Sequence, residues 1–289
     1  MKPAAHGPFE YSAIVRRPRF ELPNGAHVAL WVIPNYEFTA LDERYPPGSG
    51  ANPPDVRTWS VRDYGNRVGA FRLMKVMDRY GIRATVALNS DLCAQAPPLI
   101  EEGQARGWEW MGHGQSNTRT MTTTPPEDER GIIHDALATI TAATGTRPAG
   151  WLGPGLQETW NTLEYLADEK VEYVCDWVND DQPYLMQLDG GRSIVAMPYS
   201  TQINDKVYES NNYTSAEFSG MIKRQFDVLY REGAESGRVM AISLHPYLSG
   251  VPHRIDAFDA ALDHICSREG VWLATGAEIA RHFVAKMET

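Results

Sequence analysis

The stretch "HVALWVIPNYEF", residues 27–38, decides the fold, because an almost wholly apolar run ends abruptly in polar residues. An unbroken apolar run of this length is typical of a strand buried on both faces of a parallel sheet. Asn35 and Glu37 come next at alternate positions, so their side chains are expected to point to the same side. The stretch therefore predicts an α/β fold with functional groups at the ends of its strands.

Similar apolar runs recur along the chain and predict about seven buried strands. They cover residues 27–34, 83–89, 108–112, 172–178, 193–197, 238–244 and 271–275. Apolar residues at helical spacing separate these runs and predict helices over 68–77, 132–140, 218–229 and 255–265. Alternation of strands and helices without a composition break favours a parallel barrel or a doubly wound sheet.

One helix start is also predicted from local chemistry. Thr124, Pro125 and Glu127 form a capping-box pattern ahead of the apolar stripe over 132–140. Gly145 is expected to end that helix.

Length and composition favour one compact domain over residues 1–289, with residues 1–24 as an N-terminal extension packed on it. The formal net charge of -10 and the lack of a dense basic cluster argue against nucleic acid as a partner. Three scattered cysteines without a C-x-x-C motif favour a reducing, cytoplasmic location. No apolar run is long enough for a membrane span, so no membrane partner is expected.

Residues just beyond the predicted strands are the candidates for chemistry, since parallel α/β folds carry their sites there. These positions are polar and include two histidines. They are Asn35, Glu37, Asn89, His113, 153–155, 179–181, Tyr199, His245 and Thr275.

Glu37, His113 and His245 stand out among these candidates. A carboxylate at such a rim is a candidate general base, and the alternative is a surface glutamate paired with an arginine. Gly112 and Gly114 flank His113 and leave room for a ligand. A strand-end histidine is more often structural than catalytic, but two of them at equivalent strand ends favour a site.

Familiar nucleophile, zinc, phosphate and dinucleotide signatures are absent from the sequence. The glycine-rich stretch "GWLGPG", residues 150–155, could still offer backbone N–H groups to an oxyanion.

Six ordered motifs together resemble a known family. They are "NYE" (35–37), "GHG" (112–114), "TRPAGWLGPG" (146–155), "DWVNDDQPY" (176–184), "MPYSTQIND" (197–205) and "LHPYLSGVPHR" (244–254). The chain resembles the polysaccharide deacetylase (NodB homology) superfamily over residues 10–285, and specifically its metal-independent allantoinases and cyclic imide hydrolases. The resemblance implies a distorted (β/α) barrel of about seven parallel strands and a homotetramer or dimer.

The resemblance also bears on the metal. In the metal-dependent deacetylases the first motif is Phe-Asp-Asp-Gly and the second is His-x-x-x-His. The matching positions here place Glu37 at the base and His113 at the first histidine, but Phe38 and Asn117 at two ligand positions. Phenylalanine cannot coordinate zinc and an asparagine amide is a poor ligand, so no metal cofactor is expected. A shifted alignment would make Asn35 the base equivalent and leave a weak site of Glu37, His113 and His245.

The implied activity is a hydrolase that opens an imide, ureide or hydantoin ring, because without a metal the amide must be activated by its own structure. Glu37 or His113 is expected to take a proton from water, and His245 to protonate the leaving nitrogen. The "GWLGPG" amides and Asn35 would stabilise the oxyanion. The resemblance further places substrate contacts at Asn117, Trp151, Gly153, Gly155, Tyr199, Asn204 and Arg254. Two alternatives stay open: a metal-dependent N-deacetylase of an amino sugar polymer, and a non-catalytic binding protein.

Overall fold

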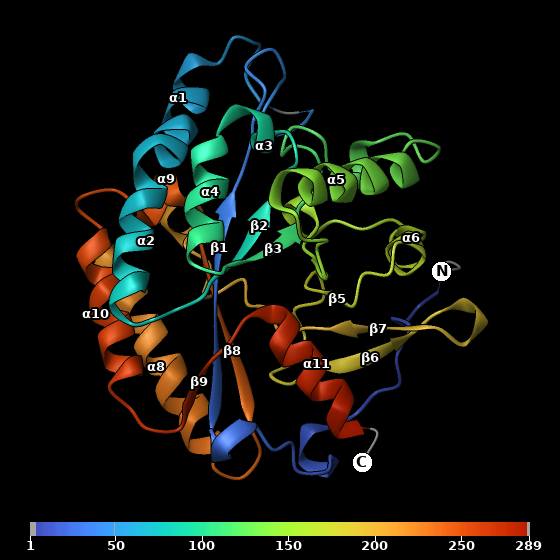
Figure 1. Cartoon of the computed structure of the whole chain (residues 1–289), viewed down its shortest axis with the longest axis vertical. Coiled ribbons are helices and arrows are strands. Elements are labelled where there is room, and N and C mark those ends of the chain that lie inside the picture. Colours follow the sequence, from blue (N-terminus) through green and yellow to red (C-terminus); the bar gives the residue numbers. More distant parts are fainter. Residues whose placement is uncertain (1–3, 49, 288–289) are drawn as a thin grey trace.

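A mostly parallel sheet forms the centre of the molecule, in a computed structural model that describes residues 4–48 and 50–287 (Figure 1). Its strands are β1 (Val28–Tyr36), β2 (Thr85–Leu88), β3 (Glu109–Gly112), β4 (Gly150–Trp151), β5 (Tyr173–Val174), β6 (Tyr184–Gln187), β7 (Ser193–Ala196), β8 (Arg238–Leu244) and β9 (Val271–Leu273). The strand order is β6-β7-β5-β4-β3-β2-β1-β8, and β9 also pairs with β1. The predicted α/β class with a parallel sheet is confirmed.

The sheet contains two strands that the sequence did not predict. The first, β4, is two residues long, and the prolines and glycines around it leave no apolar run in the sequence. The second, β6, pairs antiparallel with β7 at one end of the sheet, and its partly exposed residues lack the apolar pattern of a buried strand. All other adjacent pairs are parallel, including β1 with β8 over Val28–Pro34.

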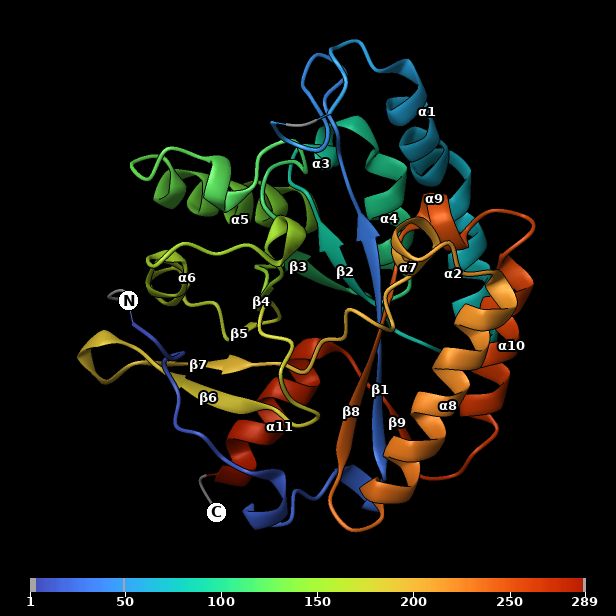
Figure 2. The ribbon, with the colours of Figure 1, turned by 180° about the vertical axis from the view of Figure 1, so that it is seen from behind.

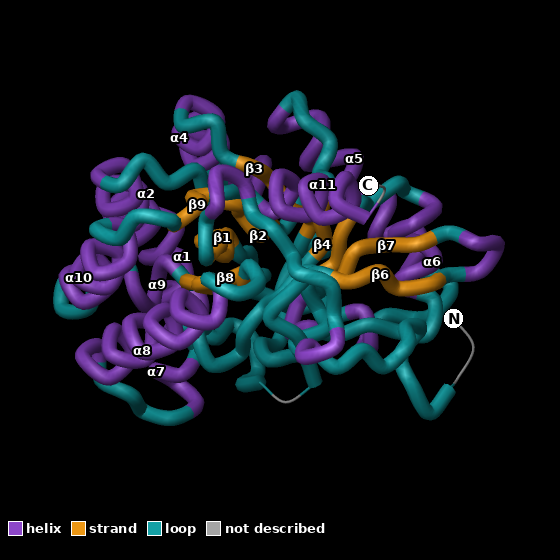
Figure 3. The backbone as a smooth tube through the Cα atoms, turned by 90° about the horizontal axis from the view of Figure 1, so that it is seen from below, coloured by secondary structure: helices purple, strands orange, loops and turns teal. Residues whose placement is uncertain are grey.

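Helices surround the sheet and bury their apolar faces on it. Their bounds are α1 (Val56–Tyr64), α2 (Ala70–Arg79), α3 (Leu92–Gln95), α4 (Pro97–Ala105), α5 (Glu129–Thr144), α6 (Thr162–Asp168), α7 (Val207–Ser210), α8 (Ser215–Gly233), α9 (Pro246–Ser249), α10 (Ile255–Cys266) and α11 (Gly276–Met287), and a π-helical turn, η3 (Gly65–Gly69), joins α1 to α2. Helices α2, α8 and α10 lie together beside β1 and β8, whereas α5 and α6 lie on the other side (Figures 1 and 2). Seen along β1, helices and loops enclose the strands (Figure 3).

The largest apolar cluster joins β1, β2 and β8 to α2, α8 and α10, and it contains the predicted stripes of α8 and α10. Phe218, Ile222 and Phe226 of α8, and Phe258 and Leu262 of α10, are all at most 2% exposed. This packing fixes β1 between β2 and β8, and it therefore also fixes the position of the residues directly after β1.

The predicted capping box at Thr124 is wrong. The helix begins at Glu129, and Thr124 lies before it in extended backbone, with its hydroxyl donating to the carbonyl of Thr120. Thr120 and Thr123 make a reciprocal capping box instead, around a short 3-10 turn. Gly145 does end the helix, in the left-handed conformation with φ of 69°.

The described part of the predicted N-terminal extension, residues 4–24, is held to the rest of the chain by hydrogen bonds and an ion pair. The backbone N–H of Gln187 donates to the carbonyl of Pro8 over 2.6 Å, and Arg17 forms an ion pair of 2.6 Å with Asp180. Residues 1–3 of the predicted extension and 288–289 of the predicted domain lie outside the described residues. Within the described part of the chain, no helix is both long and apolar enough to cross a bilayer.

Candidate active site

Glu37 is the point at which three functional side chains meet. It comes directly after β1, His113 comes after β3, and His245 comes after β8, so parallel pairing brings the three strand ends to one edge. Oε1 of Glu37 lies 3.3 Å from Nε2 of His245 and 3.8 Å from Nε2 of His113. Each residue is less than a tenth exposed. The three residues predicted to be catalytic therefore lie together.

His245 is held by a second carboxylate, that of Asp205. Oδ1 of Asp205 lies 2.7 Å from Nδ1 of the ring, and Oδ2 accepts the backbone N–H of His245 over 2.8 Å. The Ser249 hydroxyl donates to the same Oδ2 over 2.6 Å. Burial alone would lower the pKa of His245, but the charges of Glu37 and Asp205 raise it to about 9. His245 is thus a buried imidazolium at neutral pH, with its Nε2 proton facing Glu37.

Glu37 is ionised for a related reason. Burial would raise its pKa, but the charge and hydrogen bond of His245 and the charge of Arg62 hold the pKa well below its ordinary value. Nη1 of Arg62 lies 3.2 Å from Oε2, on the side away from the histidines. The Asn66 amide donates to the backbone carbonyl of Glu37 over 3.0 Å. The two carboxylate oxygens are therefore divided between an arginine and the histidine pair.

Arg62 is fixed between two aromatic rings. Its guanidinium carbon lies 4.0 Å from the ring centroid of Tyr45 and 4.5 Å from that of Tyr247. Tyr45 belongs to the loop between β1 and α1, and its side chain is hydrogen-bonded to Asn117. Lys206 donates to the Tyr247 hydroxyl over 2.7 Å. Stacking orients the guanidinium toward Glu37 and covers the site on this side.

The ring of His113 is oriented by the backbone of the next strand connection. Its Nδ1 lies 2.5 Å from the carbonyl oxygen of Leu152, just beyond β4. A carbonyl oxygen only accepts, so Nδ1 carries the proton, and in the neutral ring Nε2 presents a lone pair toward Glu37. His113 and His245 therefore offer Glu37 opposite partners, an acceptor and a donor.

A buried polar network lies beneath Glu37 and occupies three predicted contact residues. Nδ2 of Asn35 donates to the Ser243 hydroxyl over 2.9 Å and to the Leu244 carbonyl over 3.1 Å. The Tyr199 hydroxyl donates to the same Ser243 over 2.6 Å, and Asn204 donates to Tyr199 over 3.0 Å. These bonds join β1 to β8. The substrate contacts expected of Asn35, Tyr199 and Asn204 stay predictions.

One backbone N–H of the glycine-rich stretch, residues 150–155, is not free to bind an oxyanion. The N–H of Gly153 donates to Oδ1 of Asp176 over 2.7 Å, so this donor is already engaged. Gly155 is exposed, with φ of 70°, a conformation that glycine adopts readily. Trp151 is fully buried in an apolar cluster and packs on Gly112, where an added Cβ would lie 2.7 Å from the indole. The substrate contacts expected of Gly153, Gly155 and Trp151 stay predictions.

The last two predicted contacts differ in their relation to Glu37. Asn117 lies beside it, because its backbone N–H donates to the Phe38 carbonyl over 2.9 Å. Its Oδ1 is buried and lacks a hydrogen-bond partner within the described residues. Arg254 instead stacks on Tyr208 at 4.1 Å and donates weakly to a backbone carbonyl in the α9 turn.

A divalent metal, which the resemblance to deacetylases raises, does not fit this donor set. No group of three His, Cys, Asp or Glu side chains within residues 4–48 and 50–287 is arranged to hold an ion. The Arg62 guanidinium and the His245 imidazolium already neutralise Glu37, and both would repel a cation. Phe38 and Asn117 supply no strong ligand.

Two functional residues escaped prediction from the sequence. Asp205 ends the motif over 197–205, but nothing in the sequence shows that it meets His245, 40 residues further on. Arg62 lies in α1, which lacks an apolar stripe and was not predicted. A carboxylate within a motif of the resemblance was the available signal for Asp205, and Arg62 had none.

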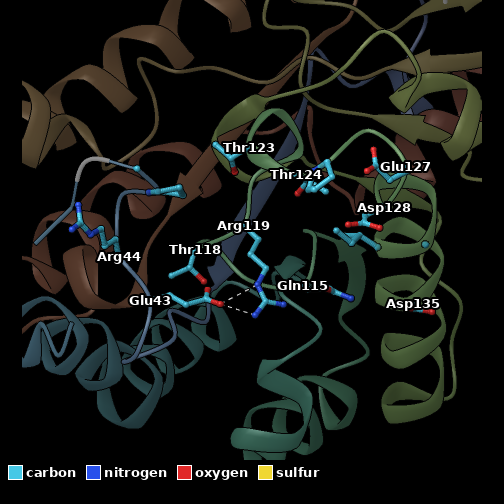
Figure 4. Close-up of a pocket in the computed structure, with 15 residues that line it drawn as sticks. Glu43, Arg44, Gln115, Thr118, Arg119, Thr123, Thr124, Glu127, Asp128 and Asp135 are labelled. Carbon is cyan, nitrogen blue, oxygen red and sulfur yellow. Dashed lines mark hydrogen bonds and ion pairs between the residues drawn. The ribbon is translucent and has the colours of Figure 1, made fainter. Parts of the chain in front are cut away.

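Two cavities adjoin the loops around the site. The smaller, of about 490 Å³, lies between α1 and the α3–α4 pair, and Glu37 and Arg62 are among its lining residues. The larger, of about 730 Å³, lies between the 43–48 loop, the 115–125 loop and α5 (Figure 4). An ion pair of 2.6 Å between Glu43 and Arg119 lies on its wall and tethers the loop that carries Tyr45.

Comparison with known proteins agrees with this geometry. The model of the polysaccharide deacetylase family matches residues 52–174. Among curated relatives, a Schizosaccharomyces pombe protein named "Putative polysaccharide deacetylase" is 26% identical over 246 residues, covering 78% of this chain and 76% of that protein. A Helicobacter pylori peptidoglycan deacetylase is 23% identical, over 77% of this chain and 86% of that protein.

Solved structures extend the likeness over nearly the whole chain. The Puue allantoinase superimposes with a TM-score of 0.87 and 27% identity, covering 95% of this chain and 96% of that one. A Pseudomonas aeruginosa protein described as a probable polysaccharide deacetylase has a TM-score of 0.87 and 26% identity, over 94% and 96% of the two chains. The fold thus matches barrel proteins of the NodB type.

Proposed function

We propose that the chain opens a small cyclic amide of imide, ureide or hydantoin type. The proposal starts from its polysaccharide deacetylase (NodB) domain, since the family consists of hydrolases that cleave carbon–nitrogen bonds of amides. The single observation that carries the proposal is the buried contact of 3.3 Å between ionised Glu37 and protonated His245. A carboxylate and an imidazolium side by side supply the base and the acid of amide hydrolysis.

Glu37 acts as the base in this scheme. Oε1 of Glu37 presents a lone pair, and so does Nε2 of His113 in the tautomer that donates from Nδ1 to Leu152, so a water molecule that donates to both is oriented for attack. As the water oxygen bonds to the ring carbonyl carbon, its proton passes to Glu37. Arg62 holds the other oxygen of the carboxylate in place.

His245 acts as the acid. Its Nε2 proton passes to the ring nitrogen as the carbon–nitrogen bond breaks, which leaves a carboxylic acid and an amine or amide on one opened chain. Asp205 keeps the ring in the tautomer and orientation that present Nε2 to the site, and it stabilises the imidazolium before the transfer.

The chemistry of the site favours an activated amide. The charges around Glu37 do not suit a divalent ion, so we propose that the reaction proceeds without a Lewis acid. A cyclic imide or ureide supplies the missing activation, because its nitrogen carries two acyl groups or lies in a strained ring and leaves more readily. The likeness to the Puue allantoinase over 95% of the chain supports the same class.

A second candidate is N-deacetylation of an amino sugar or polysaccharide. It is favoured by the matching family model and by the names of the two curated relatives. It requires a polymer or sugar chain to reach Glu37, which is 8% exposed, and a metal for which the donor set is poor.

Substitution of the two histidines tests the proposed scheme. Alanine at either His113 or His245 is expected to lower turnover of a cyclic imide by several orders of magnitude, measured by loss of ring absorbance. An alanine variant of His134, an exposed residue on α5, is the control and should retain activity. Retained activity in both active-site variants would rule the scheme out.

The assembly and the cellular location remain proposals. We propose a homotetramer or dimer in the cytoplasm, with a small-molecule partner and neither nucleic acid nor membrane. Light scattering tests the assembly, because a species near the chain mass of 32.3 kDa would contradict it.

A further inference from the structure

The cavity between α1 and the α3–α4 pair has Glu37 in its wall but neither histidine. Glu37 and Arg62 form part of its wall, whereas His113 and His245 do not. The cavity therefore reaches Glu37 from the side of α1, where Arg62 lies. Its volume of about 490 Å³ is within the range of small-molecule sites.

The lining of this cavity has an apolar, aromatic side. Trp59 of α1 and Phe71 of α2 contribute rings, and Leu92 and Leu99 contribute aliphatic surface from α3 and α4. An indole with a partly exposed face favours a flat occupant, because stacking adds to the burial of apolar area.

The polar side of the cavity is balanced in charge. Arg62 is paired with Glu37, and Arg67 is paired with Asp63, so no net charge is left for a ligand ion to neutralise. Nε of Arg62 is nevertheless buried and without a hydrogen-bond partner within the described residues, on a side chain that is only 8% exposed. Because that atom has almost no exposed surface, an occupant of the cavity does not reach it, and the paired charges of this wall favour an uncharged occupant.

We propose that this cavity is a specificity subsite, which takes an uncharged, planar substituent of the substrate whose ring is opened at Glu37. The substituent stacks on the Trp59 indole and packs against the aliphatic side chains of Leu92 and Leu99. This inference rests on the proposed function, and it names the preferred substrate class as substituted rather than bare cyclic amides.

The test compares hydantoin with 5-benzylhydantoin as substrates of the full chain. The Trp59→Ala variant is expected to lower the ratio of kcat/KM for the benzyl compound over hydantoin at least 10-fold. Ala96→Phe, which fills the same cavity from its α4 side, is expected to lower the ratio in the same direction. Trp160→Ala, which removes an indole outside this cavity, should leave the ratio unchanged. An unchanged ratio in both cavity variants would overturn the subsite.

A binding measurement separates this inference from the proposed function. Benzamide, which is planar and uncharged, is expected to bind the wild-type chain in calorimetry and to bind Trp59→Ala at least 10-fold more weakly. Should neither hydantoin be opened, the proposed function fails, and the subsite is then judged by benzamide alone. Absent binding, or equal binding to both proteins, would refute the subsite.

Discussion

The Asp205→Asn variant tests whether the charge of Asp205 keeps His245 protonated. The substitution removes one of two negative charges against the imidazole and keeps the volume of the side chain. Asp205 lies 2.7 Å from Nδ1, and Glu37 lies 3.3 Å from Nε2. Burial alone lowers the pKa of His245, so these two carboxylates raise it to about 9. Without Asp205 the pKa is expected to fall toward the ordinary value.

The size of the expected loss of activity depends on the fraction of His245 that is protonated. At pH 8 a group of pKa about 9 is about 90% protonated, whereas one at the ordinary value of about 6.5 is about 3% protonated. The acid form therefore decreases up to about 30-fold, and the basic limb of the kcat/KM profile moves from near pH 9 toward pH 6.5.

The assay is the pH profile of ring opening from pH 5 to 10 for the wild type and the variant. Asp227→Asn is the matched control, because Asp227 pairs with His264 over 2.8 Å at a partly exposed position outside the site. An Asp205→Asn profile with its basic limb at the wild-type position would refute the assignment of His245 as the acid.

Substitutions at three other residues test further parts of the account. Arg62→Met leaves the buried Glu37 without its 3.2 Å partner and is expected to lower the free energy of unfolding by about 3 kcal/mol in urea titrations; an unchanged midpoint would contradict it. Burial raises the pKa of Glu158 to about 7 and that of its neighbour Asp176 well above its ordinary value, so the folded pair holds protons that the unfolded chain loses near pH 4, and stability should fall as pH rises from about 4 to 7. Glu158→Gln should flatten this part of the stability profile, and a slope unchanged by the substitution would exclude Glu158 as its source. Arg119→Ala removes the partly exposed ion pair with Glu43, so it should cost under about 1 kcal/mol of stability but raise KM several-fold by freeing the Tyr45 loop; an unchanged KM would show that the tether has no role in binding.

The sequence predicted the framework because burial leaves a strong pattern in it. Val28–Tyr36 is buried on both faces, and its apolar run identified the central strand and the position of Glu37. The rule that strand ends carry chemistry then selected His113 and His245. By contrast, β4 lies among glycines and prolines that leave no apolar pattern, and α5 begins at Glu129, after a turn over Pro125–Asp128, rather than at a Thr124 cap.

The supporting residues of the site could not be predicted because they depend on contacts between distant segments. Arg62 meets Glu37 only because α1 folds back over the strand end, and Tyr45 of the β1–α1 loop and Tyr247 of α9 enclose its side chain. The hydrogen bond from the Gly153 N–H could not be predicted either, because its acceptor, Asp176, lies on the next strand connection. Local sequence patterns do not predict contacts between such distant segments.

The most direct measurement is ring opening by chelator-treated chain, verified free of metal by elemental analysis, on a panel of cyclic imides and ureides beside N-acetylglucosamine oligomers. We predict that at least one ring is opened without added metal and that no acetate is released from the oligomers. Acetate release that depends on added zinc, with every ring left intact, would contradict the proposed function and establish the deacetylase.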